Sequence, residues 1–249
     1  MRIILSPAKK MNVDTDSLAV GGMPEYIEQT EEILKWLRGK TRDELKALWK
    51  CNDKLTDLNA ERIAVMDLYN NLTPAVLSYE GLAFQYMAPV VFEDKHFRYV
   101  SEHLRILSAF YGVLKPMDGV VPYRLEMRAK ASILGYKDLY ELWGGRIYRA
   151  VRDDSGLIIN LASKEYSKCV ERYLASSDTY ITCVFGEEIN GKVVTKGTYA
   201  KMARGEMVRY MAENQIEDAR DIKSFDRLHF HYKDDLSTEA EYVFLREVK

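Results

Sequence analysis

The sequence begins with Met1-Arg-Ile-Ile-Leu-Ser-Pro7, in which the short apolar run Ile3 to Leu5 is followed by a serine and a proline. A continuous apolar run bounded by a turn residue is typical of a strand that is buried on both faces. We therefore predict a buried strand over Arg2 to Ser6, which Pro7 ends. Leu157 to Leu161 shows the same apolar pattern far along the chain. Two such strands indicate a core that is built on a β-sheet.

An Asn-Gly pair gives the strongest hairpin signal in the sequence. Residues Thr179 to Phe185 and Lys192 to Lys196 alternate between apolar and polar side chains on either side of Ile189-Asn-Gly191. Asn-Gly favours the two-residue turn whose twist suits a pair of antiparallel strands. We predict further strands at Ala75 to Tyr79, Leu228 to Tyr232 and Tyr242 to Arg246.

Apolar side chains at helical spacing predict helices around this sheet. The clearest start is Thr41-Arg-Asp-Glu44, which has the form of a capping box. The predicted helices run from near Pro24 to Gly39, from Thr41 past Trp49, from Asp53 to Leu68, from Phe97 to Tyr111, from Leu139 to Val151, from Lys164 to Leu174 and from Tyr199 to Glu213. Two prolines and a glycine make Gly112 to Met127 an expected ordered loop. We expect one mixed α/β (α+β) domain over residues 1–249, with a sheet-built core wrapped by helices.

The composition is that of an ordinary globular protein. The 249 residues are 47% hydrophobic and 30% charged, which excludes a disordered chain and a fibrous repeat. Because 36 basic residues stand against 38 acidic ones, any nucleic-acid site must be a local patch. Three isolated cysteines without a CxxC pair favour neither a disulfide framework nor a thiolate zinc site. No stretch approaches the ~20 apolar residues of a membrane helix, and the first apolar run is too short for a signal peptide. We expect a cytoplasmic protein with reduced thiols and no membrane association.

Positive charge gathers between His103 and Lys130, where five basic side chains that include Arg105 stand against two acidic ones. This segment contains Pro122-Tyr-Arg-Leu-Glu-Met127, which begins with a rigid residue and carries Arg124 and Glu126 two positions apart. Loops that proline holds in this way often present functional side chains. The alternative is an Arg–Glu ion pair that merely closes a surface loop.

Two further basic features lie at opposite ends of the chain. Lys9 follows the first predicted strand, and ligands tend to gather where the chain leaves the carboxyl ends of strands. Lys201 and Arg204 are three residues apart on a predicted helix, so they share one stripe of it. If that stripe lies near Lys9, the three side chains would form an anion-binding wall. The alternative is a set of solvated surface lysines and arginines.

Residues 41–69 are predicted to form two helices joined by a tight hairpin around Cys51-Asn-Asp-Lys54. In a helix-hairpin-helix motif, backbone N–H groups at the start of the second helix bind a DNA phosphate. Lys54, Asn59 and Arg62 would add side-chain contacts. This hairpin contains no glycine, although glycine permits the closest approach of a phosphate. The alternative is a plain helical hairpin packed on the core.

Metal and cofactor sites receive little support from the sequence. His229 and His231 would share one face of a strand, and Glu93-x-x-His96 is half of a di-iron motif that needs a second copy. The sequence also lacks a Walker A loop, a GxGxxG fingerprint and a GxSxG elbow. We predict that the protein has no resident metal and no cofactor.

Seven segments, in order along the chain, match the sequence of one known family. They are Ser6-Pro-Ala-Lys9, Asp53-Lys54-Leu55, Asn59-x-x-Arg62, His103-Leu-Arg-Ile-Leu-Ser108 with Tyr111-Gly-Val-Leu-Lys-Pro116, Pro122-Tyr-Arg-Leu-Glu-Met127, Asn160-Leu-Ala-Ser163 with Glu165-Tyr166, and Tyr199-Ala-Lys-Met-Ala-Arg-Gly205. On these segments the chain resembles the YaaA family of bacterial peroxide-stress proteins. The fifth and the last segments are the most specific.

The resemblance implies a cytoplasmic protein that helps cells to withstand hydrogen peroxide by limiting free intracellular iron and oxidative DNA damage. It implies a single-domain fold that binds the backbone of double-stranded DNA, with weak sequence preference, through a helix-hairpin-helix and a positively charged cleft. It implies no catalytic reaction and no cofactor. The matching positions for nucleic-acid or anion binding are Lys9, Lys54, Asn59, Arg62, Arg105, Arg124, Lys201 and Arg204.

Two functions therefore stay open at this point, and a third is weaker. The first is a DNA-binding stress protein. The second is an enzyme on a nucleotide or nucleobase-like substrate, with Lys9 and Arg124 in the cleft and Glu126 as general acid or base. The third, an iron-binding protein, suffers from the shortage of ligands. An open groove as wide as a duplex would favour DNA, whereas a closed pocket of a few hundred Å³ would favour a small ligand.

Overall fold

Strand β1 (Arg2–Leu5) lies inside the central sheet of a computed structural model that describes residues 1–130 and 132–247. Its apolar side chains are fully buried, as the opening run of the sequence predicts. β1 pairs in parallel with β5 (Leu104–Ser108) on one side and with β8 (Leu157–Leu161) on the other. The strand order is β11-β12-β9-β8-β1-β5-β6, with β10 paired to β9 at the side.

The outer strands of this sheet mix parallel and antiparallel pairing. They are β6 (Gly112–Leu114), β9 (Thr179–Ile189), β10 (Lys192–Val194), β11 (Phe230–Tyr232) and β12 (Glu241–Arg246). Two small pairs lie outside it, β2 (Lys10–Met11) with β4 (Tyr79–Glu80) and β3 (Thr73–Pro74) with β7 (Gly119–Val120). The β9–β10 hairpin turns at Asn190 and Gly191, both with positive φ, so this sequence prediction is confirmed.

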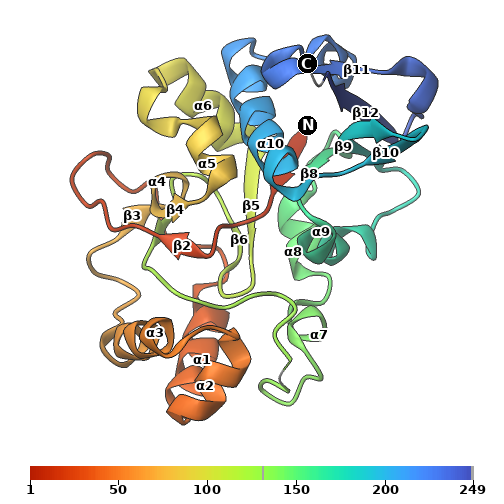
Figure 1. The fold of residues 1–249 in the computed structure, drawn as a ribbon. Coiled ribbons are helices and arrows are strands. Elements are labelled where there is room, and N and C mark those ends of the chain that lie inside the picture. Colours follow the sequence, from red (N-terminus) through yellow and green to blue (C-terminus); the bar gives the residue numbers. More distant parts are fainter. Residues whose placement is uncertain (131, 248–249) are drawn as a thin grey trace.

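Helices surround the sheet, as expected. They are α1 (Ile27–Arg38), α2 (Arg42–Trp49), α3 (Asp53–Val65), α4 (Ala75–Ser78), α5 (Leu82–Met87), α6 (Asp94–His103), α7 (Leu139–Trp143), α8 (Arg146–Val151), α9 (Lys164–Glu171) and α10 (Gly197–Glu213), with 3₁₀ turns η1 (Pro89–Val91), η2 (Ala219–Ser224), η3 (Arg227–His229) and η4 (Asp234–Leu236). Figure 1 shows α5 and α6 on one side of the central strands and α8 and α9 on the other, with α1 to α3 at the end opposite β11. Within the described ranges, no helix is long and apolar enough to cross a membrane.

The packing confirms a mixed α/β single domain. α6 contacts β1 and β5, α10 contacts β9, and these two helices also pack on each other. Buried apolar side chains from the sheet and its helices form one continuous core. At the start of α2, Thr41 and Glu44 form the predicted capping box, in which each side chain caps the other residue's backbone N–H. α2 and α3 pack as a helical hairpin, while a DNA-binding role for it stays a prediction.

The predicted helix from Phe97 to Tyr111 is wrong in its second half. α6 ends at His103, and Leu104 to Ser108 continue directly as β5 beside β1. All five residues of β5 are buried, and an apolar run of this length suits a buried strand as well as a helix. Pairing with β1 decides between the two because it satisfies the backbone groups inside the core.

Two smaller predictions also need correction. Ala75 to Ser78 form the short helix α4, and of the predicted strand only Tyr79 lies in a strand, β4; a short apolar run suits a helix as well as a strand. The predicted helix from Leu139 to Val151 is two helices, because Gly144 adopts a left-handed φ of 48° between α7 and α8. Gly112 to Met127 is mostly loop, as predicted, apart from the short strands β6 and β7.

Candidate functional site

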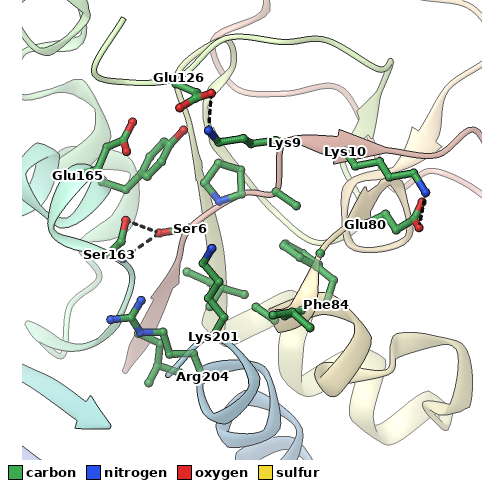
Figure 2. A pocket seen from close by; sticks show the side chains of 18 of the residues that line it. Ser6, Lys9, Lys10, Glu80, Phe84, Glu126, Ser163, Glu165, Lys201 and Arg204 are labelled. Atoms are coloured by element: carbon green, nitrogen blue, oxygen red, sulfur yellow. Dashed lines mark hydrogen bonds and ion pairs between the residues drawn. The ribbon is translucent and has the colours of Figure 1, made fainter. Parts of the chain in front are cut away.

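The order of the parallel strands creates a point where ligands usually bind. After β1 the chain crosses to β5, whereas after the neighbouring β8 it crosses to β9 on the opposite side. Adjacent parallel strands whose connections diverge in this way leave a crevice at their carboxyl ends. The structure has a pocket at that place, between the chain leaving β1 and the chain leaving β8 (Figure 2).

This pocket is small and formed by parts of the chain that are far apart in the sequence. Its volume is about 420 Å³. Its walls come from residues 5–10 at and after the end of β1, residues 80–84 at the start of α5, residues 123–126 of the central loop, residues 161, 163, 165 and 166 at and after the end of β8, and Lys201 and Arg204 of α10. Lys9, Lys201 and Arg204, the three side chains of the expected anion-binding wall, therefore line one cavity, and Arg124 lines it as well.

Two serines fix the floor of the pocket. The Ser6 hydroxyl donates to Ser163 Oγ at 3.2 Å and accepts from the Ser163 backbone N–H at 2.8 Å. These contacts tie the end of β1 to the start of α9, as Figure 2 shows. The carboxyl ends of the two strands are thus held at a fixed separation.

The loop from Pro122 to Met127 presents its polar side chains to the pocket because the intervening residues are buried. Tyr123, Leu125 and Met127 are buried, and Arg124 and Glu126 lie between them; Tyr123 and Leu125 also form part of the pocket lining. The Tyr123 hydroxyl hydrogen-bonds to Ser108 Oγ at 2.7 Å and to the Tyr79 hydroxyl at 2.9 Å. Burial raises the pKa of Tyr123 to about 12, so this hydroxyl stays protonated at neutral pH. The loop is therefore anchored in the core.

Glu126 bridges two cations at the mouth of the pocket. Its Oε1 atom lies 2.8 Å from Lys9 Nζ and 3.6 Å from an Arg124 guanidinium nitrogen. Lys9 is 64% exposed, whereas Arg124 is only 12% exposed. On the opposite rim, Lys10 pairs with Glu80 at 2.6 Å. The Arg124–Glu126 pair agrees with the ion-pair interpretation, and both side chains nevertheless face the pocket.

The α10 wall carries the positive charge that is not neutralised. Lys201 and Arg204 project from α10 towards Ser6 in Figure 2. Among the residues that the structure describes, neither side chain makes an ion pair or a hydrogen bond, and the Nε atoms of Arg204 and Arg124 are both buried without a partner. Burial lowers the pKa of Arg204, which reflects the cost of a desolvated guanidinium. A buried donor without a partner is costly, so an anion in the pocket would stabilise this wall.

Gly205 brings α10 close enough to form that wall. A Cβ atom at this position would lie 1.8 Å from the carbonyl oxygen of Ala83 in α5. The two helices pack more extensively on each other than any other pair of helices in the described chain. Glycine therefore sets the depth at which its neighbour Arg204 enters the pocket.

The remaining sequence-predicted residues lie outside the pocket. Arg105 is buried in β5, where its guanidinium donates to the carbonyl oxygens of Ser101, Glu102 and Leu104. Burial lowers the pKa of Arg105 to about 10. Its hydrogen bonds show a side chain engaged with the backbone rather than with a ligand surface.

The hairpin residues form a separate group. Lys54 is exposed on the first turn of α3, and Arg62 is partly exposed near its end. Asn59 is buried and donates to the Leu55 carbonyl oxygen of its own helix at 2.7 Å. Two acidic residues of α3 bind Arg42 of α2, so the hairpin is held together by its own charges.

A second hollow adjoins the pocket, and we call it the groove. It is more open, has a volume of about 860 Å³, and shares Lys9 and Glu126 with the pocket. Its other walls come from residues 48–50 at the end of α2, residues 127–130 and 132, and residues 137, 138 and 140. The groove therefore connects the helical hairpin to the mouth of the pocket.

Ser6, Ser163 and Glu165 stand in segments that match the family but were not among the predicted site residues, and the wall at Gly81 to Phe84 was not predicted at all. Ser6 and Ser163 each follow a buried strand closely, and this position is the signal that could have indicated them. Glu165 lines the pocket and binds the exposed Arg128 at 3.0 Å. Gly81 to Phe84 carries no local signal, because an apolar segment at helical spacing predicts only burial.

The structure also locates the candidates for metal binding. Residues 1–130 and 132–247 contain no group of three or more His, Cys, Asp or Glu side chains that could hold a metal ion. Cys51, Cys169 and Cys183 are free thiols. Burial raises the pKa of Cys169 and of Cys183 to about 12, so neither is a ready nucleophile or thiolate ligand.

Comparison with known proteins places the chain among close relatives. Residues 1–236 match a family described as "Peroxide stress protein YaaA". A "UPF0246 protein" of Agathobacter rectalis is 63% identical over 248 residues, which cover 100% of both chains. A "UPF0246 protein" of Lachnoclostridium phytofermentans is 54% identical and one of Pediococcus pentosaceus 51%, each over 99% of this chain and over 96% and 98% of the relative.

Proposed function

This chain belongs to the peroxide stress protein YaaA family, and from that premise we propose that its pocket binds and transforms a nucleotide or a nucleobase-like compound. The observation that carries the proposal is the α10 wall. Lys201 and Arg204 line a pocket of about 420 Å³ without a partner among the described residues. A pocket of this size and shape suits a small ligand better than a duplex.

The composition of the pocket supports a ligand with an anionic end and an apolar body. Lys201 and Arg204 suit a phosphate or carboxylate, because a charge-assisted hydrogen bond to a guanidinium is short and strong. Phe84 and Leu125 contribute apolar surface for the rest of the ligand. Tyr123 and Tyr166 add aromatic walls. Most small-molecule sites combine apolar walls and few polar groups in this manner.

Glu126 is the group that we propose for proton transfer. It is the carboxylate next to Lys9 and Arg124, at the mouth where a bound ligand would meet it. A positioned carboxylate that moves a proton in the transition state contributes about 10²–10⁴-fold to rate. Lys9 would then orient the carboxylate and neutralise charge that develops on the substrate.

Binding and turnover test this proposal separately. Calorimetric titration with nucleosides and nucleoside 5′-monophosphates should show binding of the monophosphates, and Lys201→Ala should weaken it by about tenfold or more. Mass spectrometry of the incubated ligands should then reveal a product. Glu126→Gln should keep affinity within about twofold while product formation falls at least about 100-fold. If no monophosphate binds, or if Glu126→Gln leaves product formation unchanged, the proposal fails in that part.

A second candidate is binding of double-stranded DNA, and the groove is the observation that favours it. Lys50, Arg128, Lys130 and Lys137 line this open hollow, against Glu126 and Asp138. We propose contacts to the DNA backbone with weak sequence preference, extended by Lys54 and Arg62 if the helical hairpin acts as a helix-hairpin-helix. The affinity should fall with salt by about 0.9 log units per log unit for each phosphate contacted. If the affinity for a 20-bp duplex did not change with salt concentration, binding through the DNA backbone would be contradicted.

We also propose that the protein acts in the cytoplasm and lowers free intracellular iron, which would limit oxidative DNA damage. Family membership supports the link to peroxide. Whole-cell paramagnetic resonance of chelatable iron tests it in a bacterial strain that lacks the protein and carries either the wild type or Arg204→Ala. If the strain with the wild type and the strain with Arg204→Ala had equal iron signals and equal peroxide survival, the pocket would not be responsible for the effect on iron.

A further inference from the structure

The pocket and the groove meet at one side-chain pair. Lys9 and Glu126 line both hollows, and the 2.8 Å contact between them forms the partition. Lys9 is mostly exposed, and an exposed ion pair is weak, so the ammonium group of Lys9 can leave Glu126 and bind an anion of the ligand instead. A ligand that enters the pocket from the groove must pass this partition.

The groove carries positive charge that the protein does not neutralise. Of its lysines, Lys50 and Lys137 are exposed and have no acidic partner within 4.0 Å among the described residues. Arg128 is paired, because it binds Glu165 at the border of the pocket. Uncompensated charge in an open hollow attracts a ligand with several negative charges.

The two hollows differ in what they can enclose. The pocket holds about 420 Å³, which lies within the range of about 300–1,000 Å³ for sites that surround one small molecule. The groove is larger and open, so it fits an extended chain rather than a compact group. Unpaired cations stand at both ends, on α10 in the pocket and at the end of α2 in the groove.

We infer that the ligand is a chain of nucleotides: one unpaired nucleotide fills the pocket with its phosphate beside Lys201 and Arg204, and the following phosphates pass Lys9 into the groove. This inference rests on the proposed function, because it assigns the nucleotide of the pocket to a longer strand. A base that is stacked and paired in a duplex must leave the stack to enter such a pocket. The ligand is therefore a single strand, a strand end or an unpaired position.

The length of the ligand tests this inference. Thymidine 5′-monophosphate, its 5′-phosphorylated dinucleotide and tetranucleotide, and a blunt duplex are titrated at one ionic strength. We expect affinity to rise by about tenfold or more from the monophosphate to the tetranucleotide, because the added phosphates reach the groove cations. The blunt duplex should bind more weakly than a single strand of equal length.

Variants test which end of the ligand lies in the pocket and which end lies in the groove. Lys50→Asn and Lys137→Ala should each weaken the tetranucleotide by about two- to tenfold and leave the monophosphate unchanged. Asparagine is chosen at position 50 because it tolerates the left-handed φ of 46° at this residue. Lys201→Ala should weaken both ligands. Lys192→Ala removes an exposed lysine in β10 that lines neither hollow, and it should change neither affinity.

The other outcomes contradict the inference, and they show whether the proposed function fails with it. If the monophosphate binds and length adds nothing, the inference fails while the nucleotide pocket stands. If groove variants weaken the tetranucleotide but Lys201→Ala does not, the chain lies in the groove alone and the inference fails. If neither the monophosphate nor any strand binds, the inference and the proposed function fail together. Unchanged thermal melting of each variant shows that lost affinity is not lost folding.

Discussion

Gly205→Ala perturbs the site without removing or replacing any side chain of the pocket. The added Cβ would lie 1.8 Å from the Ala83 carbonyl oxygen, whereas real Cβ contacts are essentially never shorter than 3.0 Å. α10 and α5 must therefore separate by about 1.2 Å, the difference between these two distances. The atom that obstructs is backbone, so no side chain can rotate out of the way.

The expected loss of stability follows from two opposing effects. Overpacking in a core costs about 1–3 kcal/mol, while alanine gains up to about 1 kcal/mol over glycine within a helix. A net loss of about 2 kcal/mol would lower Tm by roughly 4–8 °C in a chain of this length. Misplacement of about 1 Å in a binding or catalytic group costs up to about 100-fold in rate, so ligand affinity and turnover should fall as well.

A matched control lies on the same helix. A Cβ at Gly197, the first residue of α10, would meet no atom within 4 Å. Gly197→Ala should therefore leave ligand binding unchanged and raise or preserve Tm. Thermal unfolding and titration with a nucleoside monophosphate measure both variants. If Gly205→Ala melted at or above the wild-type temperature with unchanged affinity, the close approach of α10 to α5 could not be what positions Arg204.

Three further predictions follow from groups outside the pocket. Burial raises the pKa of Asp118 to about 6 from an unfolded value near 3.8, so the Asp118 contribution to the free energy of unfolding should fall as pH rises from 4 to 6. Carboxylates whose pKa is lowered contribute in the opposite direction, so the test is a difference: in urea titrations the free energy of unfolding of the wild type should fall relative to that of Asp118→Asn over this range. A thiol reagent at pH 8 should label Cys51 in the native protein and spare Cys169 and Cys183 until denaturant is added, and rapid labelling of all three would contradict their burial. Melting curves with and without a strong chelator should coincide, whereas a drop of many degrees on chelation would reveal a structural metal.

Local patterns in the sequence were sufficient wherever one short segment decides its own structure. Pro7 after three apolar residues located the end of β1, and Asn190-Gly191 located the β9–β10 turn. The three-residue spacing of Lys201 and Arg204 on a helix was enough to place both side chains on one wall. These features depend on neighbours within a few residues.

Local sequence patterns do not predict the structure of a segment that depends on contacts with residues far away in the sequence. Leu104 to Ser108 become a strand only because β1 lies beside them, and the local spacing gives no sign of that partner. The same is true of Arg105, whose charge predicts a surface position although three backbone carbonyl groups hold it inside. The wall at Gly81 to Phe84 joins the pocket through tertiary packing alone. Charge and periodicity cannot report such contacts because they describe one segment at a time.

The central position of β1 has a consequence for the timing of synthesis. Ile3, Ile4 and Leu5 emerge first from the ribosome, yet β1 is flanked on one side by β8, which begins at Leu157. At roughly 5–20 residues per second, about 150 further residues take roughly 8–30 s to be translated. During that interval this apolar segment has no β8 to cover it, and the Ser6–Ser163 contact cannot exist. The nascent chain is therefore inactive and exposed to aggregation until most of its length has left the ribosome, so slower translation before β8 should lower the yield of folded protein.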